Sequence, residues 1–242
     1  MGYGDSGLRD LTIIIPSRNE ADSLRVLVPI IYSSSSKVFE IIIVVDSIDD
    51  TSLKVKNDLQ AKFFDCRFLV SEGGGVPNAI TMGVENAKSE KILITVADEV
   101  LLPLVIDEFS NNLENRNIFV SATRYAGGGR RYGGSLVGQL FSRTFNWLLR
   151  PFCGGVTDST TGIKGFRKED WSRINKDINF GGWSCSLAFT LNAIQARMCI
   201  VEIPIVSIDR ITGGSSSFKF FYWVKEYLKV IWNNTKILKN HS

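Results

Sequence analysis

The stretch Leu11-Thr-Ile-Ile-Ile-Pro-Ser-Arg-Asn-Glu20 decides the fold, because a β-branched apolar run ends directly in a polar, acidic segment. The same pattern recurs in Ile41–Asp46 and in Ile92–Glu99. Continuous apolar runs of this kind are typical of strands that are buried on both faces of a parallel sheet. The carboxyl ends of such strands share one edge of the sheet, and ligands bind outside that edge.

Each of these three runs ends in acidic residues, namely Glu20, Asp46, and Asp98 with Glu99. We expect these carboxylates to meet in one cleft. Such a cleft suits ribose hydroxyls, a base edge, or a divalent cation that carries a phosphorylated ligand. A single acid at a strand end could instead cap the helix that follows it. The recurrence of acids at three strand ends favours the binding site.

The composition describes an ordinary globular protein of 242 residues, with 44% hydrophobic and 22% charged residues and a formal net charge of +3. One large α/β domain is the default for this length. A charge of +3 is too small to indicate a nucleic-acid partner. The cysteines show no CxxC spacing and the only histidine is His241, which argues against a zinc site or a histidine-dependent triad.

The sequence predicts a cytoplasmic protein that at most lies on a membrane surface. No N-terminal signal peptide is visible, and no run of about eighteen uncharged apolar residues is present to span a bilayer. Four cysteines without evident pairing fit a reducing compartment.

Strands and helices are expected to alternate along the first half of the chain, which indicates βαβ units. The expected strands are residues 11–15, 39–45, 66–70, 91–96 and 117–121, and the helical patterns lie near 20–32, 50–64, 77–88 and 103–114.

The second half changes character at Ala126–Gly134, where five glycines and two arginines predict neither a stable helix nor a stable strand. Ser135–Arg150 then reads as a helix with one broad apolar stripe. The stripe comprises Leu136, Leu140, Thr144, Trp147 and Leu148. Further on we expect a β-rich stretch at 160–167, a short helix near 184–197 and a strand at 199–208 that is interrupted by Pro204.

A final helix, Phe218–Lys236, combines aromatic residues with lysines. We therefore divide the chain into a main domain, residues 1–217, and a C-terminal amphipathic helix, residues 218–242. Trp and Tyr favour the membrane interface and lysines attract anionic headgroups, so this helix could dock on a membrane. It could equally pack its aromatic residues onto the domain. Both interpretations stay open.

Basic residues gather after the expected sheet and several lie beside glycines. Arginine forks bind phosphate oxygens in bidentate fashion, and a glycine-rich loop offers backbone N–H groups next to them. A solvated basic face would explain single residues. The cluster as a whole suits a second anionic substrate, as phosphoryl or glycosyl transfer would require. Its members are Arg124, Arg130, Arg131, Arg143, Lys164, Arg167, Lys168 and Arg210.

Taken in order, these motifs resemble family 2 glycosyltransferases, most closely the branch of dolichol-phosphate mannosyltransferases and other polyprenyl-phosphate glycosyltransferases. The resemblance covers roughly residues 9 to 217. The motifs are Leu11–Glu20, Glu40–Asp46, Gly75–Ala79 with Gly83, Ala97–Asp98, Arg124–Tyr125 with Gly127–Gly129, Ser142–Arg143, Asp158–Gly162 with Lys164, Val201–Pro204, and Asp209–Arg210.

The resemblance implies a GT-A, Rossmann-like α/β fold with a mostly parallel central sheet flanked by helices. It implies inverting transfer of a hexose of mannose or glucose type. The donor would be a GDP- or UDP-linked nucleotide sugar, and the acceptor a dolichyl or undecaprenyl phosphate. A divalent metal, Mg²⁺ or Mn²⁺, and a position at the cytoplasmic face of a membrane are implied as well.

The resemblance also assigns roles to individual residues. Donor binding is implied for Pro16, Ser17, Glu20, Asp46, Gly75 and Asp98. Contacts to the acceptor phosphate are implied for Arg124, Ser142, Asp158, Lys164 and Arg210. Among these, Asp98, Arg124, Ser142 and Arg210 are the expected catalytic residues, and Asp98 with Glu99 the expected metal ligands.

The sequence departs from the family pattern at three positions of chemical weight. Val96 stands where the first acid of the D-x-D motif is expected, Val100 where a polar metal ligand is common, and Gly138 where a phosphate-binding arginine is expected. Two alternatives therefore accompany the main hypothesis. One is a glycosyltransferase with a glycan or soluble acceptor, and the other is a non-catalytic homologue that binds nucleotide sugars.

Overall fold

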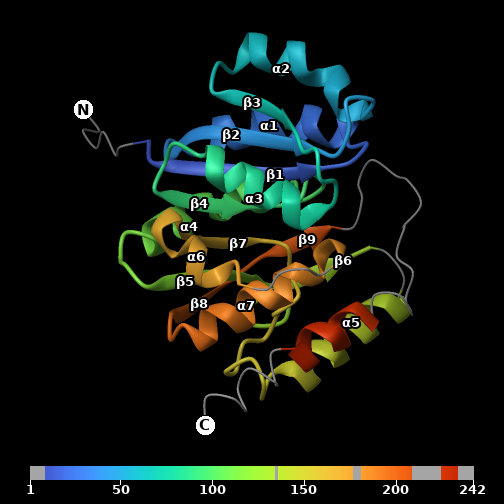
Figure 1. Ribbon diagram of the computed structural model, residues 1–242, viewed down its shortest axis with the longest axis vertical. Coiled ribbons are helices and arrows are strands. Elements are labelled where there is room, and N and C mark those ends of the chain that lie inside the picture. Colours follow the sequence, from blue (N-terminus) through green and yellow to red (C-terminus); the bar gives the residue numbers. More distant parts are fainter. Residues whose placement is uncertain (1–8, 134–135, 177–180, 209–224, 234–242) are drawn as a thin grey trace.

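The computed structural model describes residues 9–133, 136–176, 181–208 and 225–233. Its main feature is a seven-stranded sheet with the strand order β3-β2-β1-β4-β7-β5-β8, beside a two-stranded sheet of β6 and β9 (Figure 1). In the large sheet β7 runs antiparallel to both of its neighbours, β4 and β5. The other pairs in this sheet are parallel. The predicted α/β class with a mostly parallel sheet is therefore confirmed.

The strands are β1 Leu11–Ser17, β2 Val38–Val45, β3 Cys66–Val70, β4 Lys91–Ile94, β5 Ile118–Thr123, β6 Arg130–Tyr132, β7 Lys164–Arg167, β8 Cys199–Pro204 and β9 Val206–Ile208. The α-helices are α1 Ala21–Ser34, α2 Lys56–Lys62, α3 Val76–Asn86, α4 Ile106–Asn112, α5 Leu136–Leu149, α6 Trp171–Ile174 and α7 Cys185–Gln195. Four short 3₁₀ helices, among them η1 Thr51–Val55 and η2 Leu102–Val105, join these elements in the described residues.

Strand β1 lies at the centre of the first half and is buried along its whole length. Ile13 and Ile15 pack into the core that contains residues of α1, η2 and α4, whereas Ile14 packs into the core on the other face with α3 and α7. Successive side chains of a strand point to opposite faces of a sheet. Because helices cover both faces (Figure 1), the strand needs apolar residues at every position.

Helix α3 approaches β1 closely at Gly83. A Cβ atom at this position would lie 2.5 Å from Cγ2 of Ile14. The glycine therefore sets the spacing between helix and sheet, and a larger residue would push them apart.

The structure corrects one expectation from the sequence. Ala126–Gly134 was expected to hold no strand, yet Arg130–Tyr132 forms β6 and pairs in parallel with β9. Arg130 N donates to Ile205 O at 2.9 Å, just before this pairing begins. The pairing was not visible in the sequence because β6 is short, largely exposed and flanked by glycines.

Helix α5 and a helical segment at residues 225–233 lie side by side at one end of the molecule (Figure 1). The rings of Phe145 and Tyr227 are 5.2 Å apart, and Val230 is fully buried in a cluster with Leu149 and Leu187. The expected final helix, Phe218–Lys236, is described only over 225–233, and its division from the main domain stays a prediction. None of the described helices is both long enough and apolar enough to cross a bilayer.

Candidate active site

Strands β1, β2 and β4 are parallel neighbours, so their carboxyl ends lie along one edge, as the acidic pattern predicts. Two of the residues predicted to bind the donor are in contact there. The backbone N–H of Gly75 donates to Asp46 Oδ1 at 3.0 Å. Gly75 has φ of +79° and begins the turn into α3, a conformation that favours glycine. Asp46 thus fixes the loop that follows β3.

The segment after β1 is held by residues of the η1 turn. Ser17 is buried and its Oγ lies 2.9 Å from Ser52 Oγ. Asn19, whose φ is +59°, donates its backbone N–H to Asp50 Oδ1 at 3.0 Å. The backbone N–H of Glu20 donates to Ser52 Oγ. Ser52 of η1 therefore holds both Ser17, at the end of β1, and Glu20, at the start of α1.

Asp50 is a residue of this edge that the sequence analysis did not single out. Its carboxylate accepts from Asn19 and from Ser52 N, which makes it the cap of η1. An aspartate placed two residues before a serine near a helix start is a recognisable capping signal. The signal predicts the turn but not the partner Asn19, which is 31 residues away.

The two expected metal ligands, Asp98 and Glu99, follow β4 but differ in their surroundings. Asp98 is partly exposed, whereas Glu99 is 6% exposed and its Oε2 accepts from Ser207 Oγ at 2.8 Å. Within the described residues no group of three or more His, Cys, Asp or Glu side chains could hold a metal ion. Mg²⁺ is commonly held by one or two carboxylates, substrate phosphates and water. The residues fit a cation that arrives with a diphosphate, and they do not form a complete protein site.

A buried ion pair joins Arg124, which directly follows β5, to Asp158. Arg124 Nε and Nη2 donate to Asp158 Oδ2 and Oδ1 at 2.6 and 2.9 Å, and Arg124 N donates to Oδ2 at 3.1 Å. The side chains are 15% and 0% exposed. Burial opposes the charge on Arg124, but Asp158 outweighs that effect and raises the guanidinium pKa above its ordinary value. Bidentate geometry fixes the plane of the guanidinium.

Two further charged residues lie beneath this pair. Lys164 is fully buried, and its Nζ donates to Ser121 Oγ at 2.8 Å. Burial lowers the pKa of Lys164 to about 8, although Asp158 and Glu202 act in the opposite direction. Glu202 on β8 accepts from Asp158 N at 3.1 Å, and from Thr157 N and Oγ1. Glu202 therefore holds the backbone that carries Asp158.

The glycine-rich loop turns the chain sharply between β5 and β6. Gly128 has φ of +92°, which disfavours a side chain. A Cβ at Gly129 would lie 2.3 Å from the backbone oxygen of Thr123. The loop delivers Arg131 to a position opposite Ser207 in the β6–β9 pair, and Ser207 contacts Glu99. Ser207 therefore links strand β6, which carries Arg131, to Glu99 at the acidic edge.

A cavity of about 590 Å³ opens between this loop and α5. Four arginines and two tyrosines contribute to its wall, and two leucines of α5 form an apolar part of it. Its lining consists of Arg124, Tyr125, Gly128, Gly129, Arg130, Arg131, Tyr132, Leu136, Gln139, Leu140 and Arg143. The described residues that line it include no acid, so the cavity suits an anionic group.

Helix α5 is tied to both sides of this cavity. Tyr125 OH donates to Ser142 Oγ at 2.7 Å. One turn further on, Asn146 accepts from Ser159 N at 2.9 Å and donates to Thr160 Oγ1 at 2.9 Å. Ser142 is thus hydrogen-bonded to Tyr125, and Asn146 holds the segment that carries Asp158 against the same helix.

The structure brings together Arg124, Ser142 and Asp158, which were predicted on the acceptor side. Lys164 lies under Asp158 with no exposed surface. Arg210 lies outside the described residues. Sequence reasoning did not single out Tyr125 or Glu202. Each belongs to a quoted motif, but only the fold shows that Tyr125 reaches Ser142 and that Glu202 reaches Thr157.

Comparisons with known proteins identify the family of this chain. The family model described as Glycosyl transferase family 2 matches residues 12–187. Human dolichyl-phosphate beta-glucosyltransferase is 24% identical over 91% of this chain and 74% of its own length. Dolichol-phosphate mannosyltransferase of Pyrococcus furiosus is 23% identical over 85% of this chain and 58% of its own length.

Solved structures with the same fold include glucosyl-3-phosphoglycerate synthase from Mycobacterium tuberculosis in complex with Mn²⁺, uridine diphosphate and glucosyl-3-phosphoglycerate. Its TM-score is 0.70 at 14% identity, covering 93% of this chain and 80% of that chain. The same enzyme with Mn²⁺, UDP-glucose and phosphoglyceric acid has a TM-score of 0.71 and 14% identity, over 96% and 85% of the two chains. This likeness shows a GT-A-like fold.

Proposed function

This chain belongs to glycosyltransferase family 2, and from that premise we propose that it transfers a hexose from a nucleotide sugar to a polyprenyl phosphate lipid. The acceptor would lie in the membrane, and the protein would work as a peripheral enzyme at the cytoplasmic face. Two curated relatives, whose names specify glucose and mannose transfer to dolichyl phosphate, support a hexose and a lipid phosphate.

One observation carries the proposal. The cavity walled by arginines has Leu136 and Leu140 at its α5 side, and both leucines are also highly exposed on the outer surface of that helix. An anion-binding cavity that continues into an exposed apolar surface matches a molecule with a phosphate at one end and a hydrocarbon chain at the other. A soluble glycan acceptor would need neither feature.

The proposed reaction is a displacement at the anomeric carbon of the sugar. A phosphate oxygen of the acceptor forms the new bond to this carbon, and the bond from the carbon to the nucleoside diphosphate breaks with its electron pair. The sugar configuration inverts. Because the acceptor phosphate is already anionic near neutral pH, it needs little help from a general base.

Residues of this chain would act by binding and orientation. Arg124, fixed in plane by Asp158, would present its remaining guanidinium N–H groups to the acceptor phosphate. Arg130 and Arg143 would add positive charge from the loop side and from α5. On the donor side, Asp46 and Gly75 would shape the nucleoside wall, and Asp98 would face the diphosphate.

Asp98 would also be the main protein ligand of a divalent cation that accompanies the donor. When bound, such a cation would neutralise charge on the departing nucleoside diphosphate. A solved structure of similar fold contains UDP and Mn²⁺, and this supports binding of a divalent metal in general.

The proposal can be tested with purified protein and a panel of nucleotide sugars. Each sugar is incubated with a short-chain polyprenyl phosphate, with and without Mn²⁺, and the organic phase is analysed for glycolipid. We expect one donor to give glycolipid. Transfer only to soluble sugars would favour the soluble-acceptor alternative. Donor binding without transfer or hydrolysis would favour a non-catalytic homologue.

A further inference from the structure

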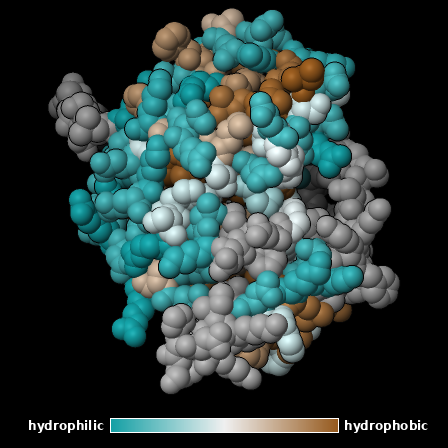
Figure 2. Space-filling view, viewed as in Figure 1, coloured by the Kyte–Doolittle hydropathy of each residue, from teal (hydrophilic) through white to brown (hydrophobic). Residues whose placement is uncertain are grey.

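Helix α5 is apolar on two opposite faces. Its inner face, with Phe145 and Leu149, packs against α7 and residues 225–233. On the outer side, five large apolar side chains of α5 and the loop after it are 56 to 82% exposed, namely Leu136, Leu140, Trp147, Leu148 and Phe152. Figure 2 shows some brown, hydrophobic side chains at the lower right of the molecule, where Figure 1 places α5 beside residues 225–233. We call this set the outer apolar face.

The outer apolar face lies in the most basic part of the sequence. Residues 115–157 contain six arginines and neither an acidic residue nor a lysine, which gives this segment a formal charge of +6. The whole chain carries +3, so the other residues together carry −3. Arg143 and Arg150, both exposed, are on α5 or at its end. On the neighbouring segment 225–233 the one acid, Glu226, is buried and paired with Lys229.

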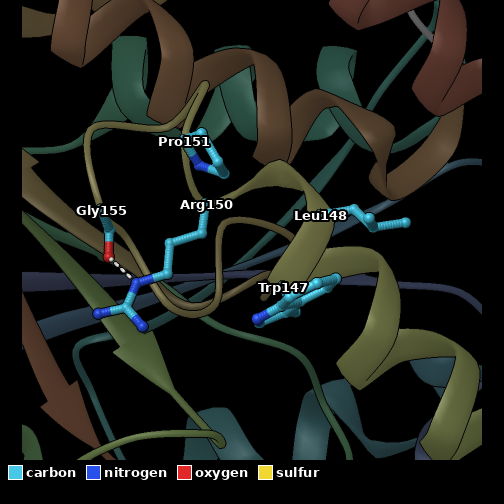
Figure 3. Close-up of a pocket in the computed structure, with 5 residues that line it drawn as sticks. All are labelled: Trp147, Leu148, Arg150, Pro151 and Gly155. Atoms are coloured by element: carbon cyan, nitrogen blue, oxygen red, sulfur yellow. Dashed lines mark hydrogen bonds between the residues drawn. The ribbon is translucent and has the colours of Figure 1, made fainter.

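A second cavity, of about 360 Å³, lies at the C-terminal end of α5. It is lined by Trp147, Leu148, Arg150, Pro151 and Gly155. Figure 3 shows the Arg150 side chain directed toward Gly155, with Trp147 and Leu148 on the neighbouring helix. Arg150 Nε donates to Gly155 O at 3.1 Å, and this bond holds the guanidinium at the cavity.

Contiguous large apolar side chains exposed over so much of one helix mark an interaction surface. Among possible partners, a bilayer with anionic lipids matches both properties of the surface. Its acyl layer accepts Leu, Phe and Trp side chains, and its headgroup phosphates attract arginine. Tryptophan beside arginine is suited to the interface between these two layers.

We propose that the outer apolar face of α5 is a docking surface for an anionic phospholipid bilayer, with the Trp147–Arg150 cavity receiving a headgroup phosphate. This inference extends the proposed function, on which it rests for the expectation of a lipid partner. It places the arginine-walled cavity at the bilayer surface, since Leu136 and Leu140 belong to both. A lipid phosphate could then reach the cavity without leaving the membrane.

The test measures binding of the full chain to vesicles with neither donor nor acceptor present. The protein is sedimented with vesicles of phosphatidylcholine alone and with vesicles of phosphatidylcholine and phosphatidylglycerol. We expect strong binding to the mixed vesicles, weakened by added salt, and weak binding to phosphatidylcholine alone. Absence of binding to the mixed vesicles would overturn the inference.

Two variants and one matched control locate the surface. Trp147→Ala should lower partitioning into mixed vesicles by about tenfold, because the exposed indole that we propose to insert into the bilayer is removed. Arg150→Gln should lower it by about fivefold, the effect of about one basic group near an anionic surface. Phe64→Ala is the control, because Phe64 is 94% exposed between α2 and β3, at the opposite end of the molecule (Figure 1). It should bind like the wild type.

Thermal unfolding of each variant checks that the fold is intact, and Phe152→Ala replaces Trp147→Ala if the latter unfolds early. Equal losses in Phe64→Ala and Trp147→Ala would overturn the inference. So would a dimer of the wild type that Trp147→Ala dissociates, because a second copy would then cover the face. Glycolipid formation without vesicle binding would overturn this inference and leave the proposed function standing. Vesicle binding without transfer would support this inference and overturn the proposed function.

Discussion

The region that we propose to bind the donor, the donor edge, and the region that we propose to bind the acceptor, the acceptor side, are built in different ways. Around the donor edge, β1 and β2 are almost wholly buried and the polar groups are bound to one another by short-range contacts such as Asp46 with Gly75. Around the acceptor side, residues 115–157 contain six arginines and no acid, five of the arginines lie at or near α5 and the glycine-rich loop, and α5 with the loop after it exposes five large apolar side chains. The first region is shaped by the core, and the second keeps charge and apolar surface available for a ligand.

Because of this difference, we expect substitutions in some parts of the molecule to lower stability and substitutions in other parts to weaken ligand binding. Residues that hold the donor edge act mainly through packing and loop geometry. Residues of the acceptor side divide into a buried charged layer, Arg124 with Asp158 above Lys164, and an exposed binding layer. Substitutions in each layer therefore test whether the two regions differ in this way.

The largest effect is expected from Asp158→Ala, which leaves Arg124 and Lys164 as buried charges without their carboxylate. Loss of one partner of a buried pair costs about 3 to 5 kcal/mol. Denaturant unfolding should show this loss, and transfer activity should disappear. The matched control is Asp22→Ala, which breaks the exposed pair with Arg25 and should cost about 0.5 kcal/mol or less. Equal costs for both variants would refute the layered description.

A second prediction concerns the pH dependence of stability. Burial lowers the pKa of Lys164 from 10.5 to about 8, so the folded state binds fewer protons than the unfolded state between these values. The unfolding free energy should therefore rise with pH across this window, by about 3 kcal/mol in all, relative to Lys164→Met. Exposed Lys54→Met is the control and should follow the wild type. Parallel curves for wild type and Lys164→Met would contradict the prediction.

The third prediction addresses the donor edge. Asp98→Ala should weaken metal-dependent binding of the nucleotide sugar by about a hundredfold, because the cation loses its main protein ligand. Stability should change little, since Asp98 is partly exposed in the turn after β4. Calorimetric titration of donor with and without Mn²⁺ measures the effect. Glu99→Gln is the companion variant, and an unchanged donor affinity in Asp98→Ala would remove Asp98 from the site.

Gly83→Ala should lower the stability of the protein and leave its catalytic properties unchanged. The added Cβ would lie 2.5 Å from Ile14 Cγ2, so α3 must shift away from β1. Overpacking of this kind costs about 1 to 3 kcal/mol. The unfolding midpoint should fall while the acceptor KM stays as in the wild type. A raised acceptor KM at unchanged stability would show that α3 communicates with the acceptor side.

The smallest effects are expected from single arginines at the exposed layer. Arg130→Gln and Arg143→Gln should each raise the KM for a short-chain polyprenyl phosphate by about tenfold, through loss of a charge-assisted contact. The donor affinity, measured without lipid, should be unchanged. Arg116→Gln is the control, because Arg116 belongs to the same basic segment but pairs with Glu169, away from the cavity. A similar rise in KM for Arg116→Gln would indicate a diffuse charge effect.

The sequence predicts the first half of the fold well because its strands are buried on both faces. Ile41–Val45 and residues 66–70 leave no other consistent assignment, and β2 and β3 lie there. Short or exposed elements carry less information. Strand β6 is stabilised by its pairing with β9, which is 74 or more residues away in the chain, and no local pattern encodes that partner.

The sequence predicts which residue types the proposed site contains, but it does not predict their geometry. Arg124 and Asp158 were both expected on the acceptor side, but their pairing depends on how the segment after β5 approaches β8. The helical spacing of apolar residues in the sequence predicts the apolar stripe on α5. This spacing does not predict which face of the helix packs against the rest of the protein. Because Phe145 and Leu149 supply a second apolar face, only packing reveals that Trp147 lies outside.

The most direct test of the account compares acceptors with one donor. The donor that supports transfer is incubated with a polyprenyl phosphate, the corresponding unphosphorylated polyprenol, and a soluble sugar, and the labelled hexose in each product is counted. The account predicts transfer to the polyprenyl phosphate alone, and a loss of that transfer in Arg124→Ala. Transfer to the polyprenol or to the soluble sugar at a comparable rate would contradict it.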